Sequence, residues 1–132
     1  MSRIRGRDTS LERQVRSILH RLGCRFRIHV ARLPGRPDVV LSRYRTVIMV
    51  HGCFWHRHRN CKYSYTPKSN VAFWINKFKE NVERDRRSAA ALKRLNWRVI
   101  TVWECQVTDP VRLAARLRRG LRINRERDRP LS

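Results

Sequence analysis

The sequence predicts one mixed α/β (α+β) domain in which a central mixed β-sheet is flanked by helices. Its length of 132 residues suits a single hydrophobic core. Segments with apolar residues at helical spacing alternate with short apolar segments that suit strands. Residues 46–50, TVIMV, are apolar on both faces, as in a strand at the centre of a sheet. The expected element order is αβββαβα.

The first helix is expected to begin at Asp8 and Thr9, because Thr9 and Glu12 have the spacing of a capping box. Gly23 is expected to end it. Its apolar residues share one face at helical spacing: Leu11, Val15, Ile18, Leu19 and Leu22.

Three strands are expected next. Apolar and polar residues alternate over residues 25–30, and residues 33–37, LPGRP, turn the chain into a second strand at 38–41. A turn at residues 42–45 then makes a hairpin with the strand at 46–50.

A long helix is expected over residues 71–95, capped by Asn70 or Ser69, and a strand is expected to return over residues 97–103. The chain shows no internal repeat.

A short Arg-rich helix over residues 111–119 is expected to stop at Gly120. We therefore expect one folded domain over residues 1–120, followed by a basic, flexible tail at 121–132.

The segment 51–61, HGCFWHRHRNC, carries the ligand types of a structural zinc site. Such a site takes four thiolate or imidazole donors in a tetrahedron. Cys53, His58 and Cys61 supply three, and Cys105 is the best candidate for the fourth. Cys24, beside a predicted strand, is interpreted as core packing.

Two disulfides in a secreted protein are the alternative use of four cysteines. The N-terminal sequence MSRIRGRD is charged and lacks the apolar segment of a secretory signal. We therefore expect a reducing compartment and a zinc site.

The charge balance predicts a polyanionic partner. The chain has 32 Lys and Arg against 10 Asp and Glu, a formal net charge of +22. This excess indicates nucleic acid without indicating what is done to it. An acidic membrane surface is the alternative, but the basic residues are spread along the chain rather than placed on one amphipathic helix. No apolar segment approaches the length of a membrane span.

The element order, with Pro37 and Asp38 at the start of the second strand, resembles the three-layer fold of the PD-(D/E)xK (restriction-endonuclease-like) nucleases. In that superfamily the aspartate binds a divalent metal, and an acidic residue and a lysine follow on the next strand. Here that strand reads TVIMVHG and contains neither. Another general base is therefore needed, and His56 is the clearest candidate.

Six ordered motifs are similar to the very short patch repair (Vsr) mismatch endonucleases: RDTSLE, LPGRPD, VHGCFWH, FW, NVERDRR and WRVITVWEC. They cover residues 1–105. The resemblance implies magnesium-dependent hydrolysis that nicks double-stranded DNA 5′ of the thymine in a T:G mismatch formed by deamination of 5-methylcytosine. It also implies a monomer in the bacterial cytoplasm, associated with the nucleoid, whose nick is passed to accessory repair proteins and a repair polymerase.

The resemblance implies roles for individual residues. Asp38 and the main-chain carbonyl of Val50 would hold magnesium. His56 would be the general base or proton donor, and Glu12 would orient it. His51 is a second-tier candidate beside the metal.

The implied cofactors are two catalytic magnesium ions and one structural zinc ion. Magnesium would neutralise the charge that builds up on the phosphodiester, and Asp38 offers the hard oxygen ligand that it prefers. An imidazole such as that of His56 can transfer a proton near neutral pH. Taken singly, Asp38 could be a turn residue, Glu12 a helix cap and His56 another zinc ligand.

Asn81 and Asp85 lie one helical turn apart in NVERDRR and therefore share a face. The resemblance implies that they support the site. The alternative is surface ion pairing with Arg84 and Arg86.

An aromatic and basic group of residues is expected to contact DNA. Phe54, Trp55 and Trp74 are candidates for insertion between bases at a mismatch, where stacking is already weak. Packing beneath the metal loop is the alternative. Arg57 and Arg59 alternate with the zinc ligands and are expected to contact phosphate.

The sequence departs from the family pattern at three points, and the first of them could lower DNA affinity or mismatch selectivity. The chain starts within the first family segment, so an N-terminal arm would be short or missing; Val50 stands where threonine can occur; and two residues separate His58 from Cys61 where some relatives have one. The competing functions are a zinc-stabilised binding module without catalysis, and a nuclease for another DNA structure or for RNA.

Overall fold

The computed structural model describes residues 10–28 and 30–122. The elements, in chain order, are α1 (Ser10–Arg21), β1 (Val39–Leu41), the 3₁₀ helix η1 (Ser42–Tyr44), β2 (Thr46–His51), α2 (Cys53–His56), α3 (Val71–Arg94), β3 (Arg98–Trp103), α4 (Glu104–Val107) and α5 (Pro110–Leu121).

The strands of the described residues form one mixed sheet in the order β1-β2-β3. β1 and β2 are antiparallel and make the expected hairpin, with Val40 opposite Val47. β2 and β3 are parallel, with Val50 opposite Val102. The long helix α3 is the crossover that parallel neighbours require. The apolar segment 46–50 is therefore the central strand, as predicted.

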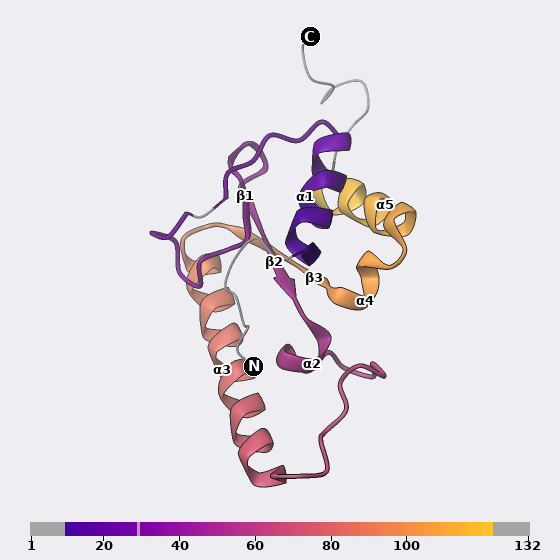
Figure 1. Ribbon diagram of the computed structural model, residues 1–132. Coiled ribbons are helices and arrows are strands. Elements are labelled where there is room, and N and C mark those ends of the chain that lie inside the picture. Colours follow the sequence, from indigo (N-terminus) through magenta and orange to yellow (C-terminus); the bar gives the residue numbers. More distant parts are fainter. Residues whose placement is uncertain (1–9, 29, 123–132) are drawn as a thin grey trace.

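Helices cover both faces of this sheet. Figure 1 shows α3 on one side and α1, α4 and α5 on the other, with α2 at the end of β2. On β2, Ile48 packs into the larger core with α1 and α5, while its neighbour Val47 packs into a smaller core with Leu92 of α3. Side chains alternate between the faces of a strand, so a strand between two helical layers must be apolar at every position.

The predicted strand at residues 25–30 is wrong in extent. It is reduced to one bridge, in which Arg27 and Val40 exchange backbone hydrogen bonds of 2.9 and 2.8 Å. The neighbouring positions of β1 are not free to extend the pairing. The N–H of Asp38 donates to the carbonyl of Ile48, and Ser42 already begins the turn.

The ends of two helices also differ from expectation. Gly120 does not stop the last helix, which continues to Leu121 and ends with Arg122 in the left-handed region. A Cβ on Gly120 would lie 3.2 Å from Cδ1 of Ile100, so this glycine allows helix and strand to approach closely. Asn70 precedes α3 as expected, but its side chain makes no capping hydrogen bond.

Some of the remaining predictions are confirmed, and others concern residues that the structure does not describe. Gly23 follows α1 with φ 83°, the conformation of a glycine that ends a helix. The capping residue Thr9 and most of the tail, residues 123–132, lie outside the described residues. Cys24 is buried in the larger core, as predicted. In the described part of the chain, no helix is long and apolar enough to cross a membrane.

Candidate active site and metal centre

Asp38 and Val50 meet where β1 begins and β2 ends. The N–H of Val50 donates to Oδ2 of Asp38 at 2.6 Å. The N–H and C=O of one strand residue point toward the same neighbour, so the carbonyl of Val50 is directed to the side on which Asp38 lies. A carboxylate and a carbonyl are the hard oxygen ligands that suit magnesium, and this pair therefore fits the predicted site.

The carboxyl group of Asp38 is in an unusual electrostatic environment. Burial is the main cause that raises its pKa from 3.8 to about 6, and the hydrogen bond from Val50 opposes the rise. The negative charge of Glu12 raises this pKa further, while His56 and Arg16 lower it. These electrostatic effects show that Glu12 and His56, which are distant in sequence, lie near Asp38 in the fold.

His56, the last residue of α2, is held by a carboxylate from α3. Its Nδ1 lies 2.6 Å from Oδ2 of Asp85. The sequence interpretation gave the orienting role to Glu12 and a supporting role to Asp85. The structure brings Asp85 to the imidazole, because α3 runs past α2 and presents Asp85 toward it, and the orienting role of Glu12 stays a prediction.

His51 lies against His56. The two rings are stacked, with centroids 3.9 Å apart and planes within 7°. His51 is buried, and its Nδ1 has no hydrogen-bond partner among the described residues. Burial and the charge of His56 lower the pKa of His51 to about 4, against the opposing effect of Asp85. At neutral pH His51 is therefore an uncharged neighbour of His56.

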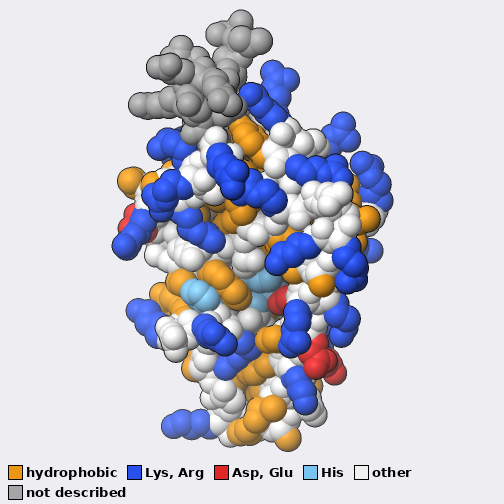
Figure 2. Space-filling view, turned by 180° about the vertical axis from the view of Figure 1, so that it is seen from behind, with side chains coloured by type: hydrophobic (Ala, Val, Ile, Leu, Met, Phe, Trp, Pro, Cys, Tyr) orange, Lys and Arg blue, Asp and Glu red, His pale blue; other side chains and the backbone are white. Residues whose placement is uncertain are grey.

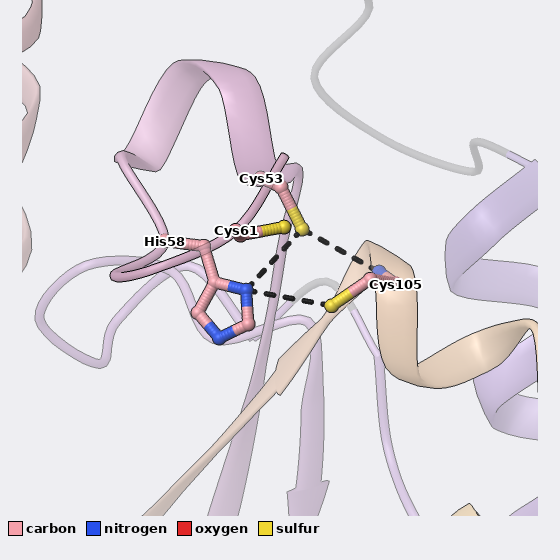
Figure 3. A group of neighbouring side chains, drawn as sticks. All are labelled: Cys53, His58, Cys61 and Cys105. Atoms are coloured by element: carbon pink, nitrogen blue, oxygen red, sulfur yellow. Dashed lines mark hydrogen bonds between the residues drawn. The ribbon is translucent and has the colours of Figure 1, made fainter. Parts of the chain in front are cut away.

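The four predicted zinc ligands converge. Cys53, His58, Cys61 and Cys105 each place one donor atom within 4.8 Å of the others (Figure 3). The Nδ1 of His58 is 3.6 Å from Sγ of Cys53 and 3.4 Å from Sγ of Cys105. A tetrahedral zinc with ordinary bond lengths would separate sulfur and nitrogen ligands by about 3.5 Å. The donor set and its spacing could therefore hold zinc. All four cysteines are free, so the disulfide alternative is not realised in this structure.

The surroundings of this cluster join distant parts of the chain. Glu104, at the start of α4, accepts a hydrogen bond of 3.3 Å from the N–H of Cys53. The N–H of Cys105 donates to Sγ of Cys53 at 3.4 Å. Trp103 stacks on the ring of His58 with centroids 4.3 Å apart. The cluster thus fixes the start of α2 to the end of β3.

The three aromatic residues predicted to contact DNA belong to one cluster between α2 and α3. The ring of Phe54 lies 5.1 Å from Trp55 and 5.6 Å from Trp74, and Trp55 lies 5.7 Å from Trp74. All three are half-buried. Asn81, buried on α3, donates to the main-chain carbonyl of Trp55 at 3.1 Å and thereby links α3 to α2.

The two arginines of the loop have different surroundings. The guanidinium of Arg57 donates to four oxygen atoms of α2 and the loop that follows. This guanidinium is engaged within the protein, and the phosphate contact of Arg57 stays a prediction. Arg59 is exposed, and its phosphate contact stays a prediction.

Figure 2 shows histidine and acidic side chains close together on a face that is otherwise rich in Lys and Arg, with hydrophobic side chains beside them. The molecule therefore combines a hydrogen-bonded His–Asp pair and a candidate metal-binding carboxylate with a basic surface. This combination, on a mixed sheet flanked by helices, is that of a DNA endonuclease.

Comparison with known proteins identifies the family. The family described as "DNA mismatch endonuclease Vsr" matches residues 1–62. The Type II nicking enzyme V.XorIIP of Xanthomonas oryzae pv. oryzae is 47% identical over 118 residues, which cover 89% of this chain and 86% of the relative. The DNA mismatch endonuclease Vsr of Escherichia coli K12 is 49% identical over 105 residues, covering 80% of this chain and 67% of the relative. The chain belongs to the Vsr family, as its motifs predicted.

Glu104 is a site residue that sequence reasoning missed. It stands beside the candidate zinc ligand Cys105 in the motif WEC, but the sequence does not show that its carboxylate reaches back to the N–H of Cys53. A carboxylate adjacent to a predicted ligand was the only available signal.

Proposed function

We propose that the protein nicks duplex DNA beside the thymine of a T:G mismatch by magnesium-dependent hydrolysis. The observation that carries the proposal is the hydrogen bond of 2.6 Å between His56 and Asp85, in the surroundings of Asp38 and next to an aromatic cluster. Membership of the Vsr family and the names of the relatives support the substrate.

Asp38 and the carbonyl of Val50 would hold the magnesium. When bound, the ion would neutralise charge on the phosphodiester and lower the pKa of a bound water. In its absence the Asp38 carboxyl has a pKa of about 6 and is mostly ionised at neutral pH. The chain therefore presents an anionic oxygen to the cation under ordinary conditions.

His56 would transfer the proton at the scissile phosphate. With Nδ1 on Asp85, the tautomer that donates from Nδ1 leaves Nε2 as the free acceptor. Neutral His51 stacks on this ring without adding a second positive charge. Asp85 is thus the positioning carboxylate. Glu12 adds negative charge beside Asp38, which would favour binding of a cation.

The zinc cluster would have a structural role. Two of its ligands, Cys53 and His58, lie on either side of His56, so a zinc ion held there would fix the backbone that carries the imidazole. Four protein ligands leave no open position for substrate, as in closed structural sites.

The aromatic cluster would recognise the mismatch. Opening the stack beside a mispair costs about a few kcal/mol, less than at a matched pair, and inserted aromatic rings can offset that cost. Phe54, Trp55 and Trp74 adjoin His56 through α2, so an inserted ring would place the neighbouring phosphate near the imidazole. The exposed Arg59 would contact the backbone.

The test is cleavage of end-labelled duplexes, matched or carrying one T:G mismatch, in a panel of flanking sequences. Magnesium is added or left out without a chelator, so that zinc is retained. We expect a magnesium-dependent nick on the 5′ side of the mismatched thymine. Asp38→Ala and His56→Ala should abolish cutting but keep duplex binding and zinc.

Three outcomes would count against the proposal. Equal cutting of all duplexes would point to a different substrate. Tight binding without cutting would indicate a binding module. Full activity in both variants would show that the site has been assigned wrongly.

A further inference from the structure

Arg57 follows α2 directly, in the left-handed region with φ 55°, and its side chain reaches the loop that follows. Nη1 donates to the carbonyls of Phe54 and Tyr65 at 3.2 and 2.9 Å. Nη2 donates to the carbonyl of Ser64 at 2.9 Å and to the hydroxyl of Thr66 at 3.2 Å. One planar group therefore ties α2 to three consecutive loop residues.

The same guanidinium also contacts α3. Its central carbon lies 3.8 Å from the centroid of the Phe78 ring, a close cation–π contact, and Phe78 is buried. Arg57 thus joins α2, the loop and α3. A lysine has the same charge but lacks the planar fork, and it could not make these contacts together.

Tyr65 is the most exposed ring that this arrangement holds. Arg57 binds its carbonyl, its ring lies 5.1 Å from that of Phe54, and 63% of its surface is accessible. Phe54 in turn contacts Trp55 and Trp74. Tyr65 therefore extends the predicted DNA-contacting aromatic cluster outward into solvent.

The exposed ring of Tyr65 and the charge of the chain favour nucleic acid as the partner that binds there. Bases offer flat apolar faces to an exposed tyrosine, and the phosphates that accompany them match a chain of net charge +22. A protein partner with an apolar patch would match the ring but not this charge.

We propose that Tyr65 is a further DNA-contacting aromatic residue and that Arg57 is the positioning residue that holds it against Phe54. The inference rests on the proposed function for the identity of the duplex. Its specific content is that Arg57 acts through Tyr65 rather than by contacting phosphate.

The test is a double-mutant cycle on binding of a fluorescent T:G duplex, and of its matched counterpart, without magnesium. Arg57→Lys and Tyr65→Ala should each weaken binding to the T:G duplex by roughly 5- to 150-fold, the range for loss of one stacked base. The double variant should bind no more weakly than Tyr65→Ala. Tyr65→Phe keeps the ring and should bind within about twofold of the wild type.

Turnover and metal content separate positioning from general damage. In Arg57→Lys we expect KM for the nicked duplex to rise while kcat at saturating DNA is unchanged, with zinc content as in the wild type. Loss of zinc together with a fall in kcat would show a general structural role and overturn the proposal.

Salt dependence separates positioning from phosphate contact. Loss of one phosphate contact lowers the slope of log affinity against log salt by about one. Arg59→Gln should show this change, whereas Arg57→Gln should keep the wild-type slope. A lowered slope in Arg57→Gln, or effects of Arg57→Lys and Tyr65→Ala that simply multiply, would contradict the proposal.

Failure of the proposed function would give a different result. If the wild type binds and cuts matched and mismatched duplexes alike, mismatch repair is excluded. The coupling of Arg57 and Tyr65, measured on the matched duplex, would still decide this inference.

Discussion

Replacing Asp38 by Asn should stabilise the metal-free protein while abolishing its activity. Asn keeps an oxygen that can accept the hydrogen bond from the N–H of Val50. It removes the ionised carboxylate, whose partial burial is unfavourable in the folded state. That unfavourable burial raises the pKa of Asp38 from 3.8 to about 6.

The expected gain in the free energy of unfolding, and the pH range over which it appears, follow from this pKa shift. The folded protein holds the Asp38 proton more tightly than the unfolded chain, so stability decreases as pH rises from about 4 to about 6. A shift of about two units corresponds to at most about 3 kcal/mol above that range. Asp38→Asn should therefore gain about 1 to 3 kcal/mol at pH 8, and this gain should shrink toward zero by pH 4.

The assay is urea unfolding at pH 4, 6 and 8 in buffers from which magnesium is omitted. Glu83→Gln, an exposed position on α3, is the matched control and should stay within about 0.5 kcal/mol of the wild type. Magnesium should then stabilise the wild type, by about 2.7 kcal/mol at a hundred times its Kd, but not Asp38→Asn.

Two results would refute this reasoning. An Asp38→Asn protein that is less stable than the wild type at pH 8 would show that the carboxylate is favourably paired in the folded state. A gain that is equally large at pH 4 and pH 8 would show that ionisation is not its cause.

Three further substitutions, one of them with a control variant, test the candidate site and the fold that positions it. Asp85→Asn should lower kcat by roughly tenfold or more with little change in duplex affinity, measured by single-turnover nicking, because the catalytic imidazole loses its ionised partner. Cys105→Ala should lose zinc and unfold at lower urea, whereas Cys24→Ala should keep its zinc by metal analysis. Gly35→Ala should lower stability by about 1 to 3 kcal/mol in thermal unfolding, since φ is +74° there and the added Cβ would lie 2.6 Å from Cβ of Ser88.

The regular elements could be predicted because they depend on local patterns. The apolar segment 46–50 indicated the central strand, and the spacing of apolar residues indicated the long helix that became α3. The convergence of the four candidate zinc ligands was also predictable, because few residue types bind zinc and few were available. The reduction of the expected strand at residues 25–30 to one bridge at Arg27 was not predictable. The extent of that strand depends on which backbone groups of β1 are already hydrogen-bonded elsewhere.

The partners of side chains could not be read from the sequence in the same way. Asp85 and Glu12 are both acidic residues on helices, and only the packing of α3 against α2 brings Asp85 to His56. Arg57 looked like a phosphate ligand because it stands among zinc ligands in a basic chain. Its left-handed backbone and the path of the following loop decide instead that its donors face the protein.

The position of His56 would make the proposed catalytic geometry depend on the candidate zinc cluster. α2 has four residues, too short to be stable as an isolated helix, and none of its residues belongs to the two hydrophobic cores. The contacts that hold it are those of the candidate zinc ligands, of Asn81 and Asp85 on α3, of the aromatic cluster and of Arg57. Since the cores lie elsewhere, loss of zinc should disturb the His56–Asp85 hydrogen bond before it opens the sheet. A zinc ion bound by this cluster would therefore hold in place the imidazole that we propose as the proton-transfer group.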